Sequence, residues 1–239
     1  MKILAFECSA KQASVAIAEN EKILTEFYSN VGLTHSQTLL PMMEAALSAC
    51  GLDIEDIDGF CIAAGPVSFT GLRIGMSAVK GLAIGNKKPC VGVSTLFAMA
   101  HCNLAFSGLI AACMDARCNQ CYCGLFLSDG KKITRVTPDM AVPMEEFCDL
   151  VNAKSEELQQ PVLIMGDGAN LFYKGFGDKL NNATLAPDGS RYQSARGVAA
   201  AALCDFISEN TVGSHELLPI YLRLPQAERE LKKKMEEQK

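Results

Sequence analysis

The order of strand and helix patterns repeats once along the chain, and this repetition constrains the fold more than any other feature of the sequence. Three strand-like segments, residues 2–8, 13–19 and 22–29, open the chain, and a helix, a strand and another helix follow. Residues 108–176 show the same series of three strands, helix, strand and helix. We therefore expect two related α/β lobes, although no residue-level repeat accompanies this order.

The repeated order also suggests where the lobes begin and end. We expect an N-terminal lobe over residues 1–103 and a C-terminal lobe over residues 104–226. A last helix with an alanine-rich apolar stripe, residues 194–210, falls within the second segment. Residues 227–239 carry one arginine and four lysines against four glutamates and have little to bury. We expect them to form a charged, solvated tail.

Composition limits the function classes. The formal net charge is −5 at pH 7, which argues against nucleic-acid binding driven by phosphate neutralisation. Glu7 interrupts the N-terminal apolar run well before it reaches the length of a signal peptide or a membrane span, so we expect a cytoplasmic protein with no membrane partner. The eleven cysteines are odd in number and scattered, so most are expected to be small, reduced core residues rather than disulfide partners.

The helix expected over residues 35–50 has an apolar arc that is wider than a single core-facing stripe requires. We expect part of this arc at the protein surface, where methionines suit an adaptable contact with a partner. The alternative is that the methionines fill a gap in the core, which is their commoner role. The arc includes Leu39, Leu40, Met42, Met43 and Leu47.

The next helix, which reaches about residue 85, contains several glycines in its interior. Each costs about 1 kcal/mol relative to alanine, so the glycines indicate close packing. Either a partner helix or the chain's own sheet could then approach more closely than the roughly 8–10 Å usual between helix axes. The small residues close to one face are Gly71, Gly75, Ala78 and Gly85, with Ser77 and Gly81 beside them.

Two glycine-containing turns are candidates for binding a phosphate. Gly65–Gly75 joins a buried strand to this helix and could hold an anion at the helix N-terminus, but it lacks the Lys-Ser/Thr ending of a P-loop and could equally be a tightly packed turn. Gly166–Asn170 follows a strand and precedes a helix, as adenosine-binding turns do in open α/β folds. Asp115 lies between two strands, where it could hold a metal-bound phosphate or pair with Arg117.

Other chemical signals are weak. Cys118 and Cys121 form one CxxC pair with Cys113 nearby, but a structural zinc site needs a second pair of ligands and the three histidines are far apart. In a strand, Cys121 and Cys123 point to one face and can pack as small apolar residues. No serine lies in a GxSxG turn, and no histidine lies in a recognisable triad setting. The sequence therefore contains no obvious catalytic set.

Several motifs along nearly the whole chain resemble one family. Gly65–Gly75, continued by Ala78–Ala83, is similar to the GPGSFTGLRIG…AKGLA signature of the TsaB family, also called YeaZ. The other matching segments are His35–Pro41 (HSExLLP in the family), Val91–Leu96 (VGVSSL), Asp115–Arg117 (DAR) and Pro219–Arg223 (PxYxR).

The resemblance implies an actin-like ATPase (ASKHA) fold, that is, an α/β fold of two ribonuclease-H-like lobes with mixed sheets. TsaB proteins are the non-catalytic partners of TsaD, which makes N6-threonylcarbamoyladenosine at position 37 of tRNAs that read ANN codons. TsaE, an ATPase, completes the bacterial set. Family members pair through their first two helices, as homodimers or with TsaD, so contact with tRNA is expected only through the complex.

The same resemblance implies a partner interface on the two helices, with no catalytic residue, metal or cofactor of this chain's own. Thr70 is expected to cap the second helix, and Arg73 to reach a carboxylate across the interface. The expected contacts are Leu39, Met42, Met43, Leu47, Thr70, Gly71, Arg73, Ile74, Gly75 and Ala78.

The sequence departs from the family pattern at three points. Residues 8–12 contain no glycine that would admit a phosphate, Val67 replaces a usual glycine, and the metal-binding HxxxH of TsaD is absent. These departures indicate that the chain resembles the non-catalytic scaffold proteins of the TsaB family rather than the transferase TsaD. The alternatives are an actin-like small-molecule kinase or ATPase that uses Glu7, Asp115 and the Gly166–Gly168 turn around Mg-ATP and, last, the M22 glycopeptidase-like activity attached to this superfamily.

Overall fold

Two mixed β-sheets, one in each lobe, organise the chain, and the computed structural model describes it over residues 1–66 and 69–223. The first sheet has the strand order β3-β2-β1-β4-β5, and the second has the order β11-β10-β6-β7-β8, with β9 also paired to β7. The first sheet contains β1 (Lys2–Glu7), β2 (Ala13–Glu19), β3 (Lys22–Ser29), β4 (Gly59–Gly65) and β5 (Cys90–Ser94). The second contains β6 (Ser107–Asp115), β7 (Gln120–Asp129), β8 (Ile133–Arg135), β9 (Met140–Pro143), β10 (Val162–Met165) and β11 (Ala183–Leu185).

The two lobes share one topology. In each, the first three strands form an antiparallel meander, and two later strands extend the sheet in parallel from its first strand. The predicted repeat and the predicted actin-like α/β fold class are therefore confirmed. The short strands β9 and β11, of four and three residues, were not predicted, because they are too short to show an alternating pattern.

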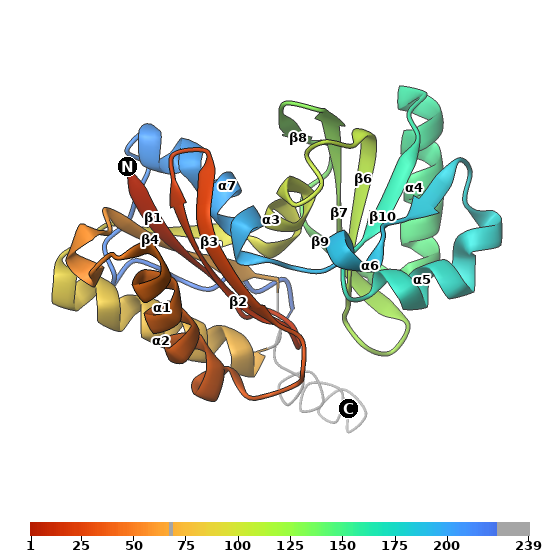
Figure 1. Cartoon of the computed structure of the whole chain (residues 1–239). Helices are drawn as coiled ribbons and strands as arrows, with labels where there is room; N and C mark the ends of the chain where they lie inside the picture. Colours follow the sequence, from red (N-terminus) through yellow and green to blue (C-terminus); the bar gives the residue numbers. More distant parts are fainter. Residues whose placement is uncertain (67–68, 224–239) are drawn as a thin grey trace, which may run out of the picture.

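Helices cover the outer faces of both sheets, and two helices lie between the sheets (Figure 1). On the first lobe α1 and α2 form the outer layer, on the second α4 and α5 do so, and α3 and α7 lie in between. The bounds are α1 (His35–Cys50), α2 (Phe69–Asn86), α3 (Thr95–His101), α4 (Met144–Leu158), α5 (Ala169–Phe176), α6 (Asp188–Arg191) and α7 (Ala195–Ile207), with 3-10 turns at Ile54–Asp56 and Gly177–Lys179.

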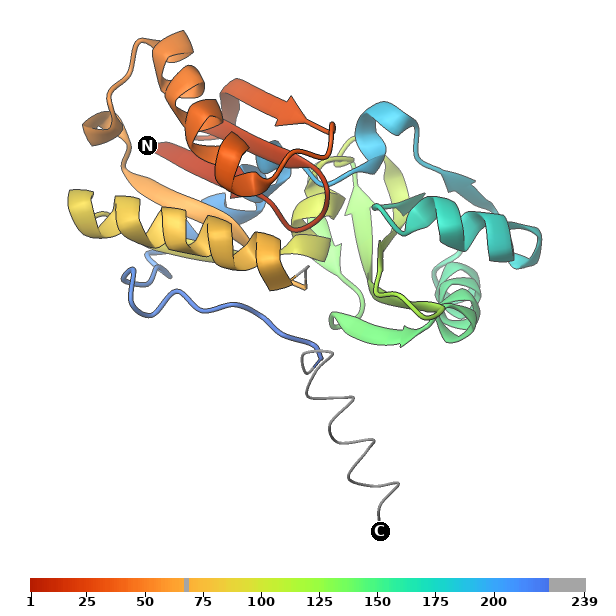
Figure 2. The same ribbon diagram turned by 90° about the horizontal axis from the view of Figure 1, so that it is seen from below.

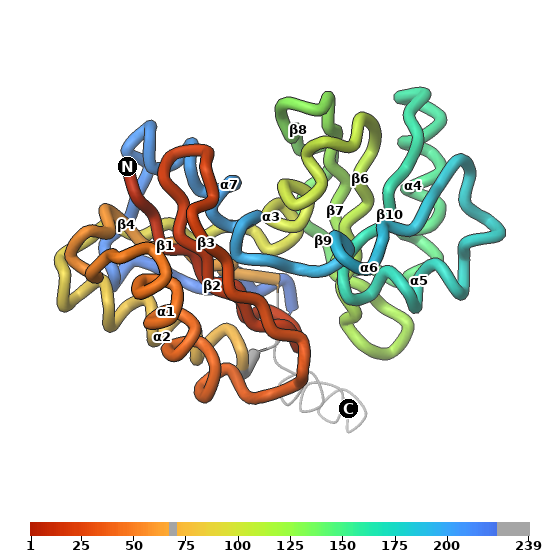
Figure 3. The backbone as a smooth tube through the Cα atoms, viewed as in Figure 1, coloured from red at the N-terminus to blue at the C-terminus, as the bar shows by residue number. Residues whose placement is uncertain are grey.

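Helix α7 belongs to the first lobe, so the predicted C-terminal lobe of residues 104–226 is wrong in its last part. Ala199, Ala202 and Phe206 of α7 pack with Ala5 and Ala16 of the first sheet. Figure 3 shows the chain crossing back from the second lobe just before this helix. An alanine-rich stripe can pack on either sheet, which is why the sequence pattern did not assign it. The tail predicted over residues 227–239 lies outside the described residues.

Residues 208–223, which we call the C-terminal strap, run beneath the first lobe towards the second (Figure 2). Val212 exchanges two backbone hydrogen bonds of 2.9 Å with Cys90 in β5, and the Ile220 N–H donates to the carbonyl oxygen of Ala64 at 2.7 Å. At the far end, the Arg223 guanidinium donates to the side chain of Gln120 in β7. The strap therefore connects a strand of each lobe.

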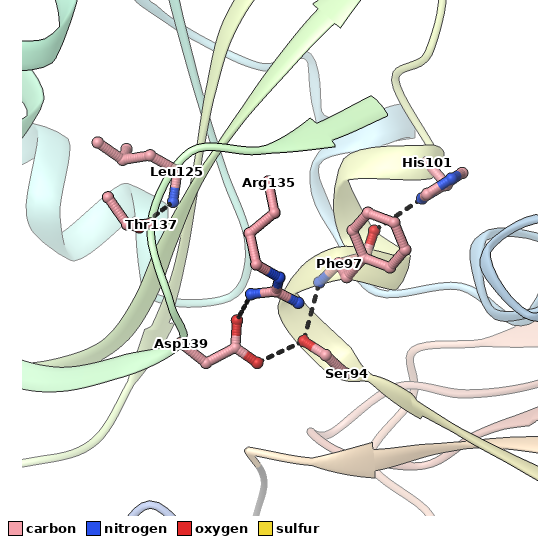
Figure 4. A network of polar contacts seen from close by, with 7 residues as sticks. All are labelled: Ser94, Phe97, His101, Leu125, Arg135, Thr137 and Asp139. Atoms are coloured by element: carbon pink, nitrogen blue, oxygen red, sulfur yellow. Dashed lines mark hydrogen bonds and ion pairs between the residues drawn. The ribbon is translucent and has the colours of Figure 1, made fainter. Parts of the chain in front are cut away.

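A second connection between the lobes lies at the start of α3 (Figure 4). The Ser94 hydroxyl accepts the Phe97 N–H at 3.2 Å and so caps α3, and it donates to Asp139 of the second lobe at 2.5 Å. Arg135 pairs with the same carboxylate, and its guanidinium carbon lies 5.4 Å from the centre of the Phe97 ring. These contacts fix α3 against the second sheet.

The close approach of α7 to α3 depends on Gly197. A Cβ at this position would lie 2.2 Å from the carbonyl oxygen of Ala98 and 2.5 Å from Cys102 Sγ, so Gly197→Ala should lower the free energy of unfolding by about 1–3 kcal/mol. Denaturant unfolding measures this change. Gly175→Ala in α5 is the control, since a Cβ there meets nothing within 4 Å. Equal stability of the two variants would contradict the packing of α3 on α7.

Candidate functional site

The inner face of α1 is part of the core of the first lobe. Leu39, Met43 and Leu47 are 1%, 8% and 9% exposed and pack with buried residues such as Leu4 and Phe6 of β1. These three predicted partner contacts are therefore corrected to core residues. The apolar arc is wide because the helix packs on both the sheet and α2.

Gly71 and Gly75 also face inward, against the end of β1. A Cβ at Gly71 would lie 2.4 Å from the Cys8 carbonyl oxygen, and one at Gly75 would lie 2.2 Å from Cys8 Sγ. The Cys8 thiol donates to the Gly71 carbonyl oxygen at 3.4 Å. Of the two explanations for glycines in this helix, packing on the chain's own sheet is correct for this pair. Their prediction as partner contacts is therefore wrong.

The remaining predicted contacts lie nearer the surface. Arg73 is exposed, whereas Met42, Ile74 and Ala78 are partly buried. The side chain of Thr70 lies outside the described residues. The helix begins at Phe69, so Thr70 lies within its first turn.

The outer face of α2 carries a stripe of exposed small residues. Ser77, Gly81 and Gly85 are spaced four apart and exposed, and a Cβ at either glycine would meet nothing within 4 Å. Ile84 beside them is 67% exposed. We call Ser77, Gly81, Ile84 and Gly85 the α2 outer stripe. Gly81 thus lowers the stability of the helix without improving packing within the described chain, whereas Gly85 lies one residue before the helix ends.

A second candidate site lies where the ends of β1 and β10 face each other across the lobes. Glu7 at the end of β1 is 1% exposed, and Asp167 in the turn after β10 is close enough to raise its pKa. Asp167 accepts a hydrogen bond of 2.8 Å from the amide nitrogen of Gln193, a fully buried residue just before α7. We call Glu7, Ser9, Asp167 and Gln193 the interlobe acid site.

Local backbone geometry builds this site. One Glu7 oxygen accepts the Ser9 N–H at 2.6 Å, so a backbone donor of the loop after β1 is used within the loop itself. The Gly166–Gly168 turn packs tightly, because a Cβ at Gly168 would lie 2.7 Å from the backbone nitrogen of Asp115. Asp115 pairs with the exposed Arg117 at 3.4 Å, which is the simpler of its two predicted roles.

Burial dominates the electrostatics of the interlobe acid site. It raises the pKa of the Glu7 carboxyl from 4.5 to about 7, with a further contribution from the charge of Asp167. Burial likewise raises the pKa of Asp167. A group with positive charge would stabilise both ionised carboxylates here.

The cysteine pattern has a structural explanation. Cys113 and Cys123 face each other in the β6–β7 register, and both are buried with Cys121 in the core that the second sheet forms with α4 and α5. All cysteines are free thiols, and Cys118 lies exposed at the turn between the strands. Within the described residues, no group of three His, Cys, Asp or Glu side chains is arranged to hold a metal ion.

Within residues 1–66 and 69–223, no helix combines the length and the apolar character that crossing a bilayer requires.

The raised pKa of Glu7 predicts a pH-dependent stability. Because the pKa of Glu7 in the folded state lies above its ordinary value, the protonated carboxyl contributes its full stabilisation of the fold below about pH 4.5. This contribution is lost as the pH rises through about 7. Between pH 4.5 and pH 8 the free energy of unfolding of Glu7→Gln should therefore rise by up to about 3 kcal/mol relative to that of wild type. Urea unfolding with a chelator present measures this difference. Glu157→Gln, at a 59% exposed side chain, is the control. A pH-independent difference between Glu7→Gln and wild type would contradict the burial of an ionisable carboxyl.

Comparisons with known proteins agree with the two-lobed fold. A model of the family described as TsaD, tRNA N6-adenosine threonylcarbamoyltransferase, matches residues 29–228. The tRNA threonylcarbamoyladenosine biosynthesis protein TsaB of Bacillus subtilis (strain 168) is 28% identical over 95% of this chain and 96% of its own length. The protein of the same name from Escherichia coli (strain K12) is 29% identical over 93% and 95%. The solved structure of YeaZ from Pseudomonas aeruginosa has a TM-score of 0.77 at 25% identity, covering 92% of this chain and 99% of that one. The chain therefore belongs to the TsaD family and, within it, to the TsaB group, also called YeaZ.

Proposed function

We propose that this chain is a non-catalytic scaffold subunit in the synthesis of N6-threonylcarbamoyladenosine at position 37 of tRNAs that read ANN codons. In this role it binds TsaD through the outer surface of α1 and α2 and supports the catalytic site of that partner. The names of its relatives, tRNA threonylcarbamoyladenosine biosynthesis protein TsaB, support a role in this pathway.

The α2 outer stripe is the observation that carries the docking surface. Gly81, in the interior of α2, costs about 1 kcal/mol relative to alanine, and a Cβ there would meet nothing within 4 Å, so no packing within the described chain offsets that cost. A partner helix could use the missing side chains to approach α2 closely. Ile84 and Leu40, which are 67% and 44% exposed, supply apolar area on the outer faces of α2 and α1.

Charge and polarity at the edge of this surface can orient the partner. Arg73 is exposed on α2, one turn before Ser77, and can reach a carboxylate on a facing helix. We propose that the same surface forms a homodimer when TsaD is absent, so that the two assemblies exclude each other. TsaE joins the complex with TsaD, and tRNA is bound through the complex.

The loop after β1 supports a scaffold rather than an ATPase. Its Ser9 N–H is bonded to the carboxylate of Glu7, and residues 8–12 contain no glycine that would let a phosphate approach the backbone. A buried acid that already uses this donor repels a phosphate group. We therefore propose that the chain needs no nucleotide cofactor of its own.

Reconstitution tests the scaffold role most simply. TsaD and TsaE, supplied with tRNA and the threonylcarbamoyl donor, should form the modified adenosine at least tenfold faster when this chain is added, because it completes the assembly around TsaD. The chain alone should give no product by nucleoside mass spectrometry. Product formed by the chain alone, or a rate that does not respond to its addition, would contradict the proposal.

Substitutions in the α2 outer stripe test the docking surface. Gly81→Arg should weaken TsaD binding at least tenfold by placing a long charged side chain at the closest contact, while the free chain keeps its stability because the position is open. Gly81→Ala should raise the free energy of unfolding by up to about 1 kcal/mol. Calorimetry and sedimentation measure binding and self-association.

Gly175→Arg is the matched control for this test. Gly175 is an exposed helical glycine with open space around it, but it lies in α5 on the other lobe. Unchanged TsaD binding by Gly81→Arg, or an equal loss with Gly175→Arg, would show that docking does not use α2.

A further inference from the structure

Two links join the N-terminal ends of α1 and α2 to the second lobe. The first begins at His35, the first residue of α1, whose Nε2 lies 2.9 Å from the carbonyl oxygen of Ala10. Nε2 carries the proton of this hydrogen bond, because a carbonyl oxygen can only accept. Ala10 in turn packs against the core that α3 forms with the second sheet. We call this contact the α1 link.

The second link begins beside α2 and follows the C-terminal strap. Leu217 of the strap lies in the same core as Leu72 on the inner face of α2. Ile220 bonds to Ala64 in β4, the strand that leads into α2. A Cβ at Gly65, the last residue of that strand, would lie 2.2 Å from the Ile220 carbonyl oxygen. The strap is therefore held closely against the start of α2.

The far end of the strap reaches the second lobe at β7. The Arg223 guanidinium donates to the side chain of Gln120, and its carbon lies 5.6 Å from the centre of the Tyr122 ring. Tyr122 packs against the same core of the second lobe as Ala10 does. We call the contact of Arg223 with Gln120 and Tyr122 the strap link. Both helices are thus joined to one core by two separate routes.

Each link leaves one buried polar atom unpaired. These atoms are Nδ1 of His35 and Nη1 of Arg223, which have no hydrogen-bond partner within residues 1–66 and 69–223. A buried polar group without a partner costs free energy, and water recovers that cost when the group is exposed. The closed form of each link is therefore only slightly favoured over an open form. A bound partner can then shift the balance between them.

We propose that the α1 link and the strap link form a latch that closes when TsaD docks, so that docking fixes the second lobe relative to α1 and α2. This inference rests on the proposed docking role. The docking surface includes Leu40 on α1 and Ile84 on α2, and close helix packing tolerates only small displacements between the two helices. The closed links fix both helix ends, so TsaD binds the closed form best, and by linkage its binding closes the links.

Hydrogen exchange of the full-length chain, free and saturated with TsaD, tests the latch. The amides of residues 118–122, next to the strap link in the second lobe, should exchange at least threefold more slowly in the complex than in the free chain. Arg223→Ala should abolish this difference even when TsaD is bound at saturation. Helix α5, on the outer side of the second lobe, should exchange at the same rate in every sample (Figure 1).

Binding affinities test the positioning role of the two links. By calorimetry, Arg223→Ala and His35→Ala should each weaken TsaD binding at least threefold, because the partner must then fix the helices itself. His35→Gln should restore binding, since its amide N–H can donate to the Ala10 carbonyl oxygen. Arg196→Ala is the matched control and should bind as wild type does, because Arg196 lies 3.8 Å from Glu26 of its own lobe.

The outcomes separate the latch from the docking role. If TsaD binds wild type without slowing exchange at residues 118–122, or if the slower exchange persists in Arg223→Ala, the latch is wrong and the docking role stands. If TsaD does not bind wild type, the docking role is wrong and the latch with it. Circular dichroism establishes that the variants are folded, and Gln120→Ala removes the strap link from the other side if Arg223→Ala does not fold.

Discussion

The contact between Cys8 and the first half of α2 determines the positions of both candidate sites. Gly71 and Gly75 let the helix lie against the end of β1, where any Cβ would meet Cys8 at 2.2–2.4 Å. This contact fixes the rotation of α2 about its axis. It also fixes the end of β1. Glu7 directly precedes Cys8, so its side chain points to the opposite face of the sheet, towards the second lobe. This one close contact thus directs the α2 outer stripe to the protein surface and the Glu7 side chain towards the second lobe.

The rotation of α2 divides its small residues into two sets with different roles. Gly71 and Gly75 stabilise the lobe by allowing the helix to pack on the sheet, so they belong to the interior. A Cβ at Gly81 or Gly85 would meet nothing within 4 Å, and the cost of the interior Gly81 to helix stability points to a contact outside the chain. The docking surface and the interlobe acid site lie on opposite faces of the first sheet.

The sequence predicted the parts of the structure that depend on local patterns. The repeated element order and the bounds of α1 were correct, because periodicity acts within a few residues. The lobe to which α7 belongs was not predictable, since an alanine-rich stripe fits either sheet. The contact of Ser94 with Asp139 joins residues 45 positions apart, and no sequence signal marks it.

The error in the predicted interface has a simple cause. From Gly75 to Gly81 a helix turns by about 600°, so the two glycines point about 120° apart. Gly85, however, lies only about 40° from Gly71 on a helical wheel, so the wheel alone could not divide the glycines between the sheet and the surface. Gln193 was missed altogether, because it reaches Asp167 only through the tertiary fold.

Hydroxyl-radical footprinting of the chain with and without TsaD tests the central claim most directly. Ile84, Ile207 and Leu171 are 67%, 69% and 50% exposed and lie on α2, at the end of α7 and on α5. We expect TsaD to protect Ile84 from oxidation at least severalfold and to leave Ile207 and Leu171 unchanged. Oxidation of Ile84 at the same rate in the free chain and in the complex would contradict the assignment of the outer face of α2 to a partner.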